Sequence, residues 1–300
     1  MIRVRKLTPT LLDAWMVDQR LPNNHARYRL RLWRDEATAL PALKPELRAY
    51  IDEALDDARQ RLRRGFTDPL SPFTIPSPDP AANFPAALNR LTLQGYFGET
   101  LAVLAVEHWG AANHTDWQVP AFLFRSHDQE FQHLDEINQR LADGQPHDPD
   151  AVTERRPGRT GDDALAFRRN PQNTITDIIT LEAKCLSRSS NAKIEAAHQN
   201  LAAAGLRPNG IHELIGILQD YNTPDANSWQ QSLIELWRSG YRTATRYDGV
   251  AYVTGHIPAR GTRQAWLPDQ PHPSYTATRH LDGIEFQFAD LDRIVDEMYR

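Results

Sequence analysis

Apolar residues recur every three or four positions in several stretches of the chain, which is the spacing of an amphipathic helix. We predict helices over residues 44–64, 89–108, 126–141, 191–204, 211–219, 228–238 and 291–299. Shorter apolar stretches bounded by turn residues predict strands over 119–124, 164–167, 174–184, 249–255 and 283–288. Because strands alternate with helices, we expect an α/β fold with a mixed central sheet flanked by helices.

Proline divides the chain into two parts. Six prolines lie within residues 67–85, where regular structure is therefore not expected. We predict a helical N-terminal arm with a Pro-rich linker over residues 1–88. A larger domain with a C-terminal extension is expected over residues 89–300.

Composition narrows the class of protein. The chain has 300 residues, of which 40% are hydrophobic, so it can bury a sizeable core. A net charge of −5 gives no general attraction to polyanions, and the single cysteine, Cys185, excludes a disulfide framework. No signal-type or membrane-spanning apolar stretch occurs, so we expect a cytoplasmic protein without membrane association. Phosphate-loop, dinucleotide-binding and nucleophile-elbow motifs are also absent from the sequence.

One predicted strand, over residues 174–184, carries an unusual polar pair near its end. Alternation places Glu182 and Lys184 on one face of this strand, while Leu181, Ala183 and Cys185 lie on the other. We therefore expect Cys185 to be a small core residue. A carboxylate beside an ammonium group is costly to bury, and a divalent metal ion is one candidate to compensate that cost.

Turn residues suggest which residue lies opposite this pair. Residues 170–173 read Asn-Pro-Gln-Asn, which favours a turn between the two predicted strands. A turn centred between Gln172 and Asn173 places Asp163 opposite Glu182, although a shift of two residues is also compatible. In that register the two side chains lie roughly 5 Å apart at Cβ, close enough to share a cation.

Such a pair of carboxylates suits Mg²⁺, or alternatively Mn²⁺, because these ions prefer oxygen ligands and retain several waters. The ion would polarise a phosphodiester and lower the pKa of a bound water. Lys184 would orient that water or stabilise the developing charge. Glu99, in the middle of the helix predicted over residues 89–108, would complete the site if this helix packs against the hairpin.

The order of these elements resembles the PD-(D/E)xK nucleases. A helix with Glu99 is followed by a strand preceded by Asp163, a turn, a strand with Glu182-Ala183-Lys184 and a further helix. The resemblance covers about residues 89–206 and implies a restriction-endonuclease-like core. It implies that Asp163 and Glu182, with Glu99 as a further ligand, bind the metal and that Lys184 assists the attacking water.

Two positions leave alternatives open. Gly161-Asp162 stands where many members of this superfamily have Pro-Asp, so Asp162 is an alternative to Asp163 as a ligand. Gln199 resembles a polar residue often found on the helix after the motif.

The general arrangement is also similar to the nuclease subunit of Hachiman-type anti-phage defence systems. That resemblance implies cleavage of invading DNA and a helicase or ATPase partner subunit. Local charge favours a polyanion, since residues 154–193 hold eight basic residues against five acidic ones, an excess of three. The alternative is a nuclease-like protein that has lost catalysis and acts as a regulatory or scaffolding subunit.

Overall fold

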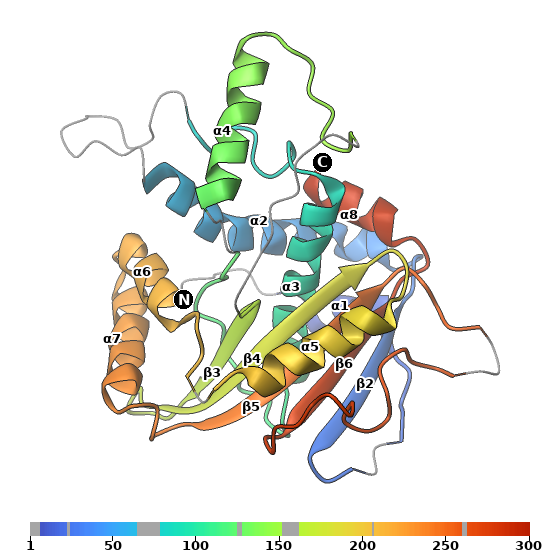
Figure 1. The fold of residues 1–300 in the computed structure, drawn as a ribbon, viewed down its shortest axis with the longest axis vertical. Helices are drawn as coiled ribbons and strands as arrows, with labels where there is room; N and C mark the ends of the chain where they lie inside the picture. Colours follow the sequence, from blue (N-terminus) through green and yellow to red (C-terminus); the bar gives the residue numbers. More distant parts are fainter. Residues whose placement is uncertain are drawn as a thin grey trace.

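One six-stranded mixed sheet forms the centre of the fold (Figure 1). The computed structural model describes residues 7–22, 25–64, 79–124, 128–151, 162–205, 207–259 and 263–300. The strand order is β1-β2-β6-β5-β4-β3, with β2, β6, β5 and β4 parallel and the edge strands β1 and β3 antiparallel to their neighbours. The bounds are β1 Met16–Asp18, β2 Tyr28–Asp35, β3 Ala164–Arg169, β4 Ile175–Leu186, β5 Thr245–Thr254 and β6 Leu281–Gln287. The predicted α/β class with a mixed sheet flanked by helices is confirmed.

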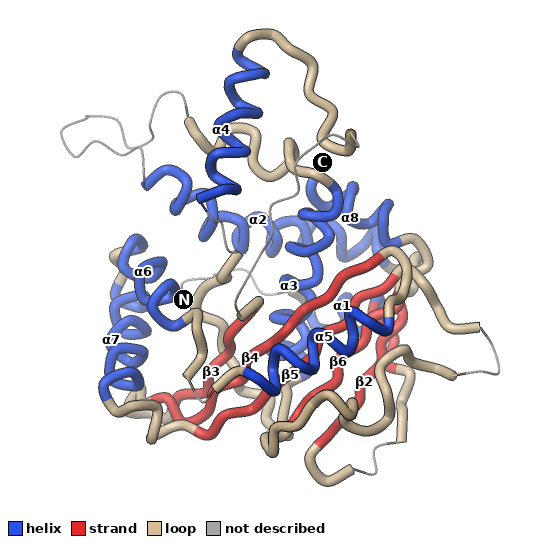
Figure 2. Tube along the Cα trace, viewed as in Figure 1, coloured by secondary structure: helices blue, strands red, loops and turns tan. Residues whose placement is uncertain are grey.

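Helices cover both faces of this sheet (Figure 2). The helices are α1 Pro9–Trp15, α2 Leu40–Arg64, α3 Arg90–Trp109, α4 Asp128–Ala142, α5 Asn191–Ala203, α6 Ile211–Tyr221, α7 Pro224–Arg238 and α8 Leu291–Tyr299. On one face, residues of α1, α2, α3 and α8 form the largest hydrophobic cluster with Leu181, Ala183 and Ala251. On the other face, α5 packs on Val250 and Tyr252. Alternation along β5 therefore separates the two layers.

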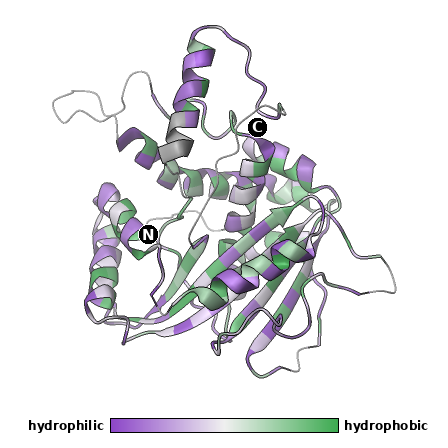
Figure 3. Cartoon of the chain, in the orientation of Figure 1, coloured by the Kyte–Doolittle hydropathy of each residue, from purple (hydrophilic) through white to green (hydrophobic). Residues whose placement is uncertain are grey.

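A third cluster lies beside the β3–β4 hairpin, where α6 and α7 pack on Leu165, Phe167 and Ile178. Figure 3 shows hydrophobic and hydrophilic segments mixed along the strands as well as along the helices. The hydrophobic residues of the strands are buried beneath the helices on both faces, as expected for a sheet enclosed between helical layers. Among the described residues, every helix is either too short or too polar to cross a lipid bilayer.

The N-terminal part contains the helix expected over residues 44–64, which is α2, and it adds α1 and two strands that the sequence pattern did not indicate. Strand β2 pairs in parallel with β6, so that Tyr28 lies opposite Leu281 and Arg34 opposite Gln287. Sequence periodicity did not indicate β1 or β2. Residues 65–78, which include most of the predicted Pro-rich linker, lie outside the described residues.

One predicted strand, over residues 119–124, was wrong. The segment is buried but forms no strand, and a proline, Pro120, interrupts it. Two of its backbone N–H groups donate to carboxylates, from Val119 to Glu107 at 3.0 Å and from Phe122 to Asp57 at 2.6 Å. Side chains of α2 and α3 thus satisfy backbone groups that a neighbouring strand would otherwise bind.

The hairpin register agrees with the prediction from turn chemistry. Ala164 lies opposite Leu181 and Arg168 opposite Asp177, which extends to Asp163 opposite Glu182. A β-bulge after Arg168 shifts the register by one residue next to the turn. At the turn, Asn173 adopts a φ of 61° and donates its N–H to the Asn170 carbonyl.

Helix α3 approaches strand β4 unusually closely at Gly98. A Cβ atom added to Gly98 would lie 2.8 Å from the Cβ of Cys185. That distance is well inside van der Waals contact, so only glycine fits between this helix and this strand. Cys185 packs against the hydrophobic cluster on the α3 face, as predicted, and burial raises the pKa of its thiol.

We expect Gly98→Ala to destabilise the protein, although alanine favours helices by about 1 kcal/mol over glycine. The overpacking against Cys185 should cost about 1–3 kcal/mol and outweigh that gain. The matched control is Gly216→Ala, in helix α6, where an added Cβ meets no atom within 4 Å. Thermal unfolding should show a lower melting temperature for Gly98→Ala and an unchanged or higher one for Gly216→Ala. A rise in both variants would contradict the close packing of α3 on β4.

Candidate active site

Strand β4 extends beyond the end of its pairing with β3, and the candidate site lies at this unpaired end of β4. The last pair of the β3–β4 ladder joins Ala164 to Leu181, so β3 provides no partner for the next residues of β4. Asp163 fills the first of these places, because its Oδ2 accepts the Ala183 N–H at 2.7 Å. The carboxylate of Asp163 therefore lies beside Glu182 and Lys184 by the geometry of the hairpin itself.

The Lys184 ammonium is surrounded by three oxygens. Its Nζ lies 2.7 Å from Glu182 Oε1, 3.0 Å from the Ala183 carbonyl and 3.6 Å from Asp163 Oδ2. Glu182 is only 6% exposed, so this ion pair lies largely out of solvent. The structure thus brings Asp163, Glu182 and Lys184 together, as the register predicted.

Charge in this cluster is unbalanced, with two carboxylates around one ammonium. Burial, followed by the charge of Asp163, raises the pKa of Glu182, while Lys184 and Asn200 oppose that rise. Burial alone would lower the pKa of Lys184, but the charges of Asp163 and Glu182 raise it. The site therefore favours additional positive charge next to the two carboxylates.

Asn200 is a site residue that sequence reasoning missed. Its Nδ2, in the last turn of α5, donates to Glu182 Oε1 at 3.0 Å. Gln199, the predicted candidate on this helix, instead donates to Glu195 on the exposed side of α5. A partial signal was present, because Asn200 follows the buried Ala197 by three positions and so lies at the edge of the packed face, although it is itself exposed.

A buried ionic network holds helix α5 in the position that brings Asn200 to the site. Asp248 is fully buried and accepts from Arg279 Nε at 2.8 Å. Arg279 in turn donates to the Leu201 carbonyl at 2.7 Å, and Arg246 donates to the Gly205 carbonyl. Positive side chains at the C-terminus of a helix also complement its dipole.

Glu99 lies on α3, which packs on the opposite face of the sheet from α5. It is 5% exposed, and its charge contributes to the raised pKa of Lys184. Within the described ranges, however, no three His, Cys, Asp or Glu side chains gather as they would around one metal ion. The structure thus assembles two carboxylates closely, and Glu99 stands further from them than the predicted three-ligand set requires.

The structure separates Asp162 from Asp163. Asp162 is buried and its Oδ2 accepts the Gly210 N–H at 3.0 Å, next to the start of α6. Asp163 points to β4 instead. Since consecutive residues of an extended segment project in opposite directions, only Asp163 joins Glu182 and Lys184.

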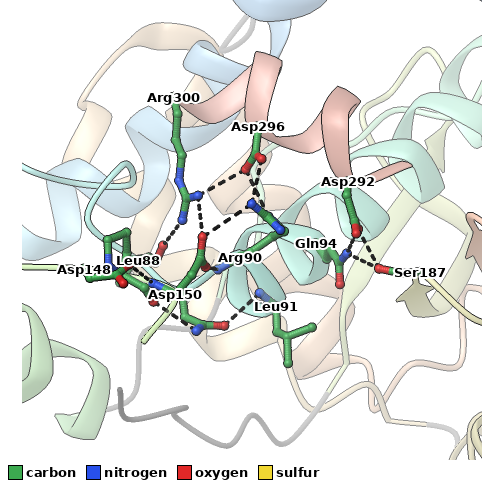
Figure 4. Close-up of polar contacts among 12 residues, drawn as sticks. Leu88, Arg90, Leu91, Gln94, Asp148, Asp150, Ser187, Asp292, Asp296 and Arg300 are labelled. Carbon is green, nitrogen blue, oxygen red and sulfur yellow. Dashed lines mark hydrogen bonds and ion pairs between the residues drawn. The ribbon is translucent and has the colours of Figure 1, made fainter. Parts of the chain in front are cut away.

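Two polar clusters fix α3 and the end of β4 relative to α8 (Figure 4). Gln94 Nε2 donates at 2.7 Å to both Ser187, just after β4, and Asp292 of α8. Arg90 pairs with Asp296 at 2.9 Å at the start of α3. These contacts tie down both elements that carry Glu99 and Lys184.

The basic residues of the predicted polyanion-binding patch lie in different structural environments. Arg168 pairs with Asp116 and Asp177, and Arg169 stacks on a tryptophan ring with its Cζ 3.5 Å from the centroid. Arg188 and Lys193, between β4 and the first turn of α5, are exposed. The remaining members, Arg155, Arg156 and Arg159, lie outside the described residues.

The chemistry of the donor set suits a hard divalent cation. Two carboxylates and one backbone carbonyl surround the Lys184 ammonium, which takes the place of a cation among them. Oxygen ligands of this kind are those that Mg²⁺ and Mn²⁺ bind, with waters completing the shell. Asp163 and Glu182 are the residues that would hold such an ion.

We expect the metal-free protein to lose stability as the pH rises above about 4.5, the ordinary pKa of a glutamate, because the pKa of Glu182 is raised in the folded chain. In that window the folded chain binds more protons than the unfolded chain, so a higher pH favours unfolding. Glu182→Gln should remove this contribution. Melting temperatures between pH 4.5 and 8 in a metal chelator should therefore fall less steeply for Glu182→Gln than for Glu195→Gln, a control on the exposed face of α5. Identical pH profiles would contradict the unbalanced charge.

Comparison with known proteins adds no relative. No protein-family model matches the chain. No curated protein shows significant similarity to it.

Proposed function

We propose that this protein is a metal-dependent nuclease that hydrolyses DNA phosphodiester bonds. The observation that carries the proposal is the convergence of Asp163, Glu182 and Lys184 at the end of the β3–β4 ladder. The buried Glu182, the half-buried Asp163 and one ammonium supply both a place for a cation and a charged donor beside it. The resemblance of the same residues to the PD-(D/E)xK nucleases supports this choice of chemistry.

In this proposal the residues of the chain bind the metal ion and orient the groups around it. Asp163 and Glu182 would hold Mg²⁺ or Mn²⁺, with Glu99 contributing negative charge from α3. When bound, the ion would polarise the phosphodiester and acidify a bound water. Asn200 fixes the orientation of the Glu182 carboxylate through its hydrogen bond.

Lys184 has the role of a charged donor. Its pKa is raised, so the ammonium stays protonated at neutral pH and can stabilise negative charge that develops on the phosphate. In the cation-free arrangement it pairs with Glu182 at 2.7 Å. Lys184 would be available to the phosphate once its pair with Glu182 is relieved.

The resemblance to the Hachiman-type nuclease subunit is the basis for three further parts of the proposal: DNA as substrate, an anti-phage role in the cytoplasm, and a helicase or ATPase partner. Exposed Arg188 and Lys193 support contact with a phosphate backbone, because they lie on the segment that follows Lys184. The chain's net charge of −5 means that such contacts must be local.

A second candidate function is a catalytically silent nuclease-like scaffold. One observation favours it: in the part of the chain that the structure describes, only two carboxylates approach closely, and no three-residue metal group forms. Lys184 neutralises part of their charge. In this alternative the ion pairs serve stability alone.

The purified protein should cleave DNA only with Mg²⁺ or Mn²⁺, and Glu182→Gln should abolish cleavage while keeping the fold. Lys184→Ala should reduce the rate by about 10²–10⁴, because it removes a positioned charged donor. Single- and double-stranded DNA are to be incubated with and without each ion, with helical content checked by circular dichroism. Cleavage that Glu182→Gln retains would exclude the assigned role of Glu182. No cleavage of either substrate by the wild type, alone or with a bound partner, would favour the scaffold.

Asn200→Ala should slow cleavage by about 10- to 100-fold, since it frees the Glu182 carboxylate to rotate. Gln199→Ala, one position earlier and directed to Glu195, should leave the rate unchanged. The comparison is made at equal metal concentration, and the metal dependence of the rate should shift only in Asn200→Ala. Equal effects of the two substitutions would remove Asn200 from the site.

A further inference from the structure

A cavity of about 570 Å³ lies beside helix α5, away from the candidate active site. Its floor includes Leu30 of β2 and Ile194 of α5, and its far wall is the segment of residues 263–269. The active-site residues belong to β4 and to the segment just before β3, and in the sheet β5 and β6 separate β4 from β2, which lines the cavity (Figure 1). The volume is typical of pockets that bind small molecules, and the proposed cleavage chemistry makes no use of it.

The wall of this cavity is held rigidly by buried polar groups. Glu285 is fully buried on β6, and its carboxylate accepts the N–H of Trp266 at 2.8 Å and that of Leu267 at 2.7 Å. Tyr28 donates its hydroxyl to the Pro268 carbonyl at 2.7 Å. Burying a carboxylate is costly, so this arrangement is expected where a loop must keep one conformation. The pocket is therefore formed before any ligand arrives.

The lining combines an apolar floor with positive charge at the rim. Leu30, Ile194 and Leu267 supply the apolar part of the lining. Arg263 lies over the Trp266 ring, with its Cζ 3.9 Å from the centroid. Among the residues that the structure describes, no hydrogen bond or ion pair engages its guanidinium, so its N–H groups are available to an anion.

The polar groups around the rim match the edge of a heterocycle. Asn191, Gln264 and Asp269 line the cavity and offer both donors and acceptors. Asn191 is also the first residue of α5, whose N-terminal end favours negative charge. A ligand that matches this lining is partly apolar, with hydrogen-bonding edges and an attached anion.

We infer that this cavity binds a nucleotide, with the base over Leu30 and Ile194 and the phosphate against Arg263. The ligand is either a free nucleotide or the terminal nucleotide of a strand, since both share this chemistry. Helix α5 would connect the two sites, because Asn191 and Asn200 are separated by about 14 Å along its axis. The inference does not depend on cleavage at the active site.

Calorimetric titration of the full chain in a metal chelator tests the inference, because the chelator silences any cleavage. The probes are the ribo- and deoxyribonucleoside 5′-monophosphates, the matching nucleosides, inorganic phosphate, and a short oligodeoxynucleotide with or without a 5′-phosphate. We expect at least one nucleotide to bind more tightly than its nucleoside and than phosphate. Tighter binding of the phosphorylated oligonucleotide than of any mononucleotide would identify a strand end as the source.

Arg263→Ala should weaken nucleotide binding at least ten-fold and leave nucleoside binding unchanged. Arg263 is exposed, so the fold should persist, as an unchanged melting temperature would show. The matched control is Arg238→Ala, at the exposed end of α7, which should bind like the wild type. Absence of binding by every nucleotide, equal binding of phosphate alone, or an unaffected Arg263→Ala would each overturn the inference. Nucleotide binding without DNA cleavage would refute the nuclease proposal alone, and cleavage without nucleotide binding would refute this one alone.

Discussion

The hydrogen bond from the Ala183 N–H to Asp163 is the contact on which the candidate site depends. Beyond the last backbone pair of β3 and β4, the Asp163 side chain takes the place of a β3 backbone carbonyl and accepts the next free N–H of β4. This hydrogen bond also fixes a second carboxylate within 3.6 Å of the Lys184 ammonium, which already pairs with Glu182. Two like charges held this close need a cation, and one ammonium meets that need only in part.

The surrounding layers hold this strained charge arrangement in place. On one face, Gly98 lets α3 approach β4 and bring the charge of Glu99 toward Lys184. On the other face, the network around Asp248 anchors the C-terminal end of α5, three residues after Asn200. Rigid support from both faces is what a site requires if its carboxylates are to bind a cation with little rearrangement.

Local signals in the sequence predicted the hairpin and its register. Turn residues and strand alternation together specify one hairpin, so Asp163, Glu182 and Lys184 could be placed together without a structure. Long-range pairing could not be predicted in this way. Strand β2 joins β6 across some 250 residues, and carboxylates from two helices replaced the strand expected over residues 119–124. The orientation of α5 about its axis brings Asn200, and not Gln199, to Glu182. That orientation depends on how the helix packs, which the sequence pattern only suggested.

The central claim is that Asp163 and Glu182 form a binding site for a divalent cation. Anomalous diffraction from crystals soaked in Mn²⁺ tests it most directly, because the signal locates the ion itself. The account predicts a peak between the two carboxylates, with the Lys184 ammonium displaced from Glu182. Absence of a peak there, with Lys184 still paired to Glu182 at saturating Mn²⁺, would contradict it.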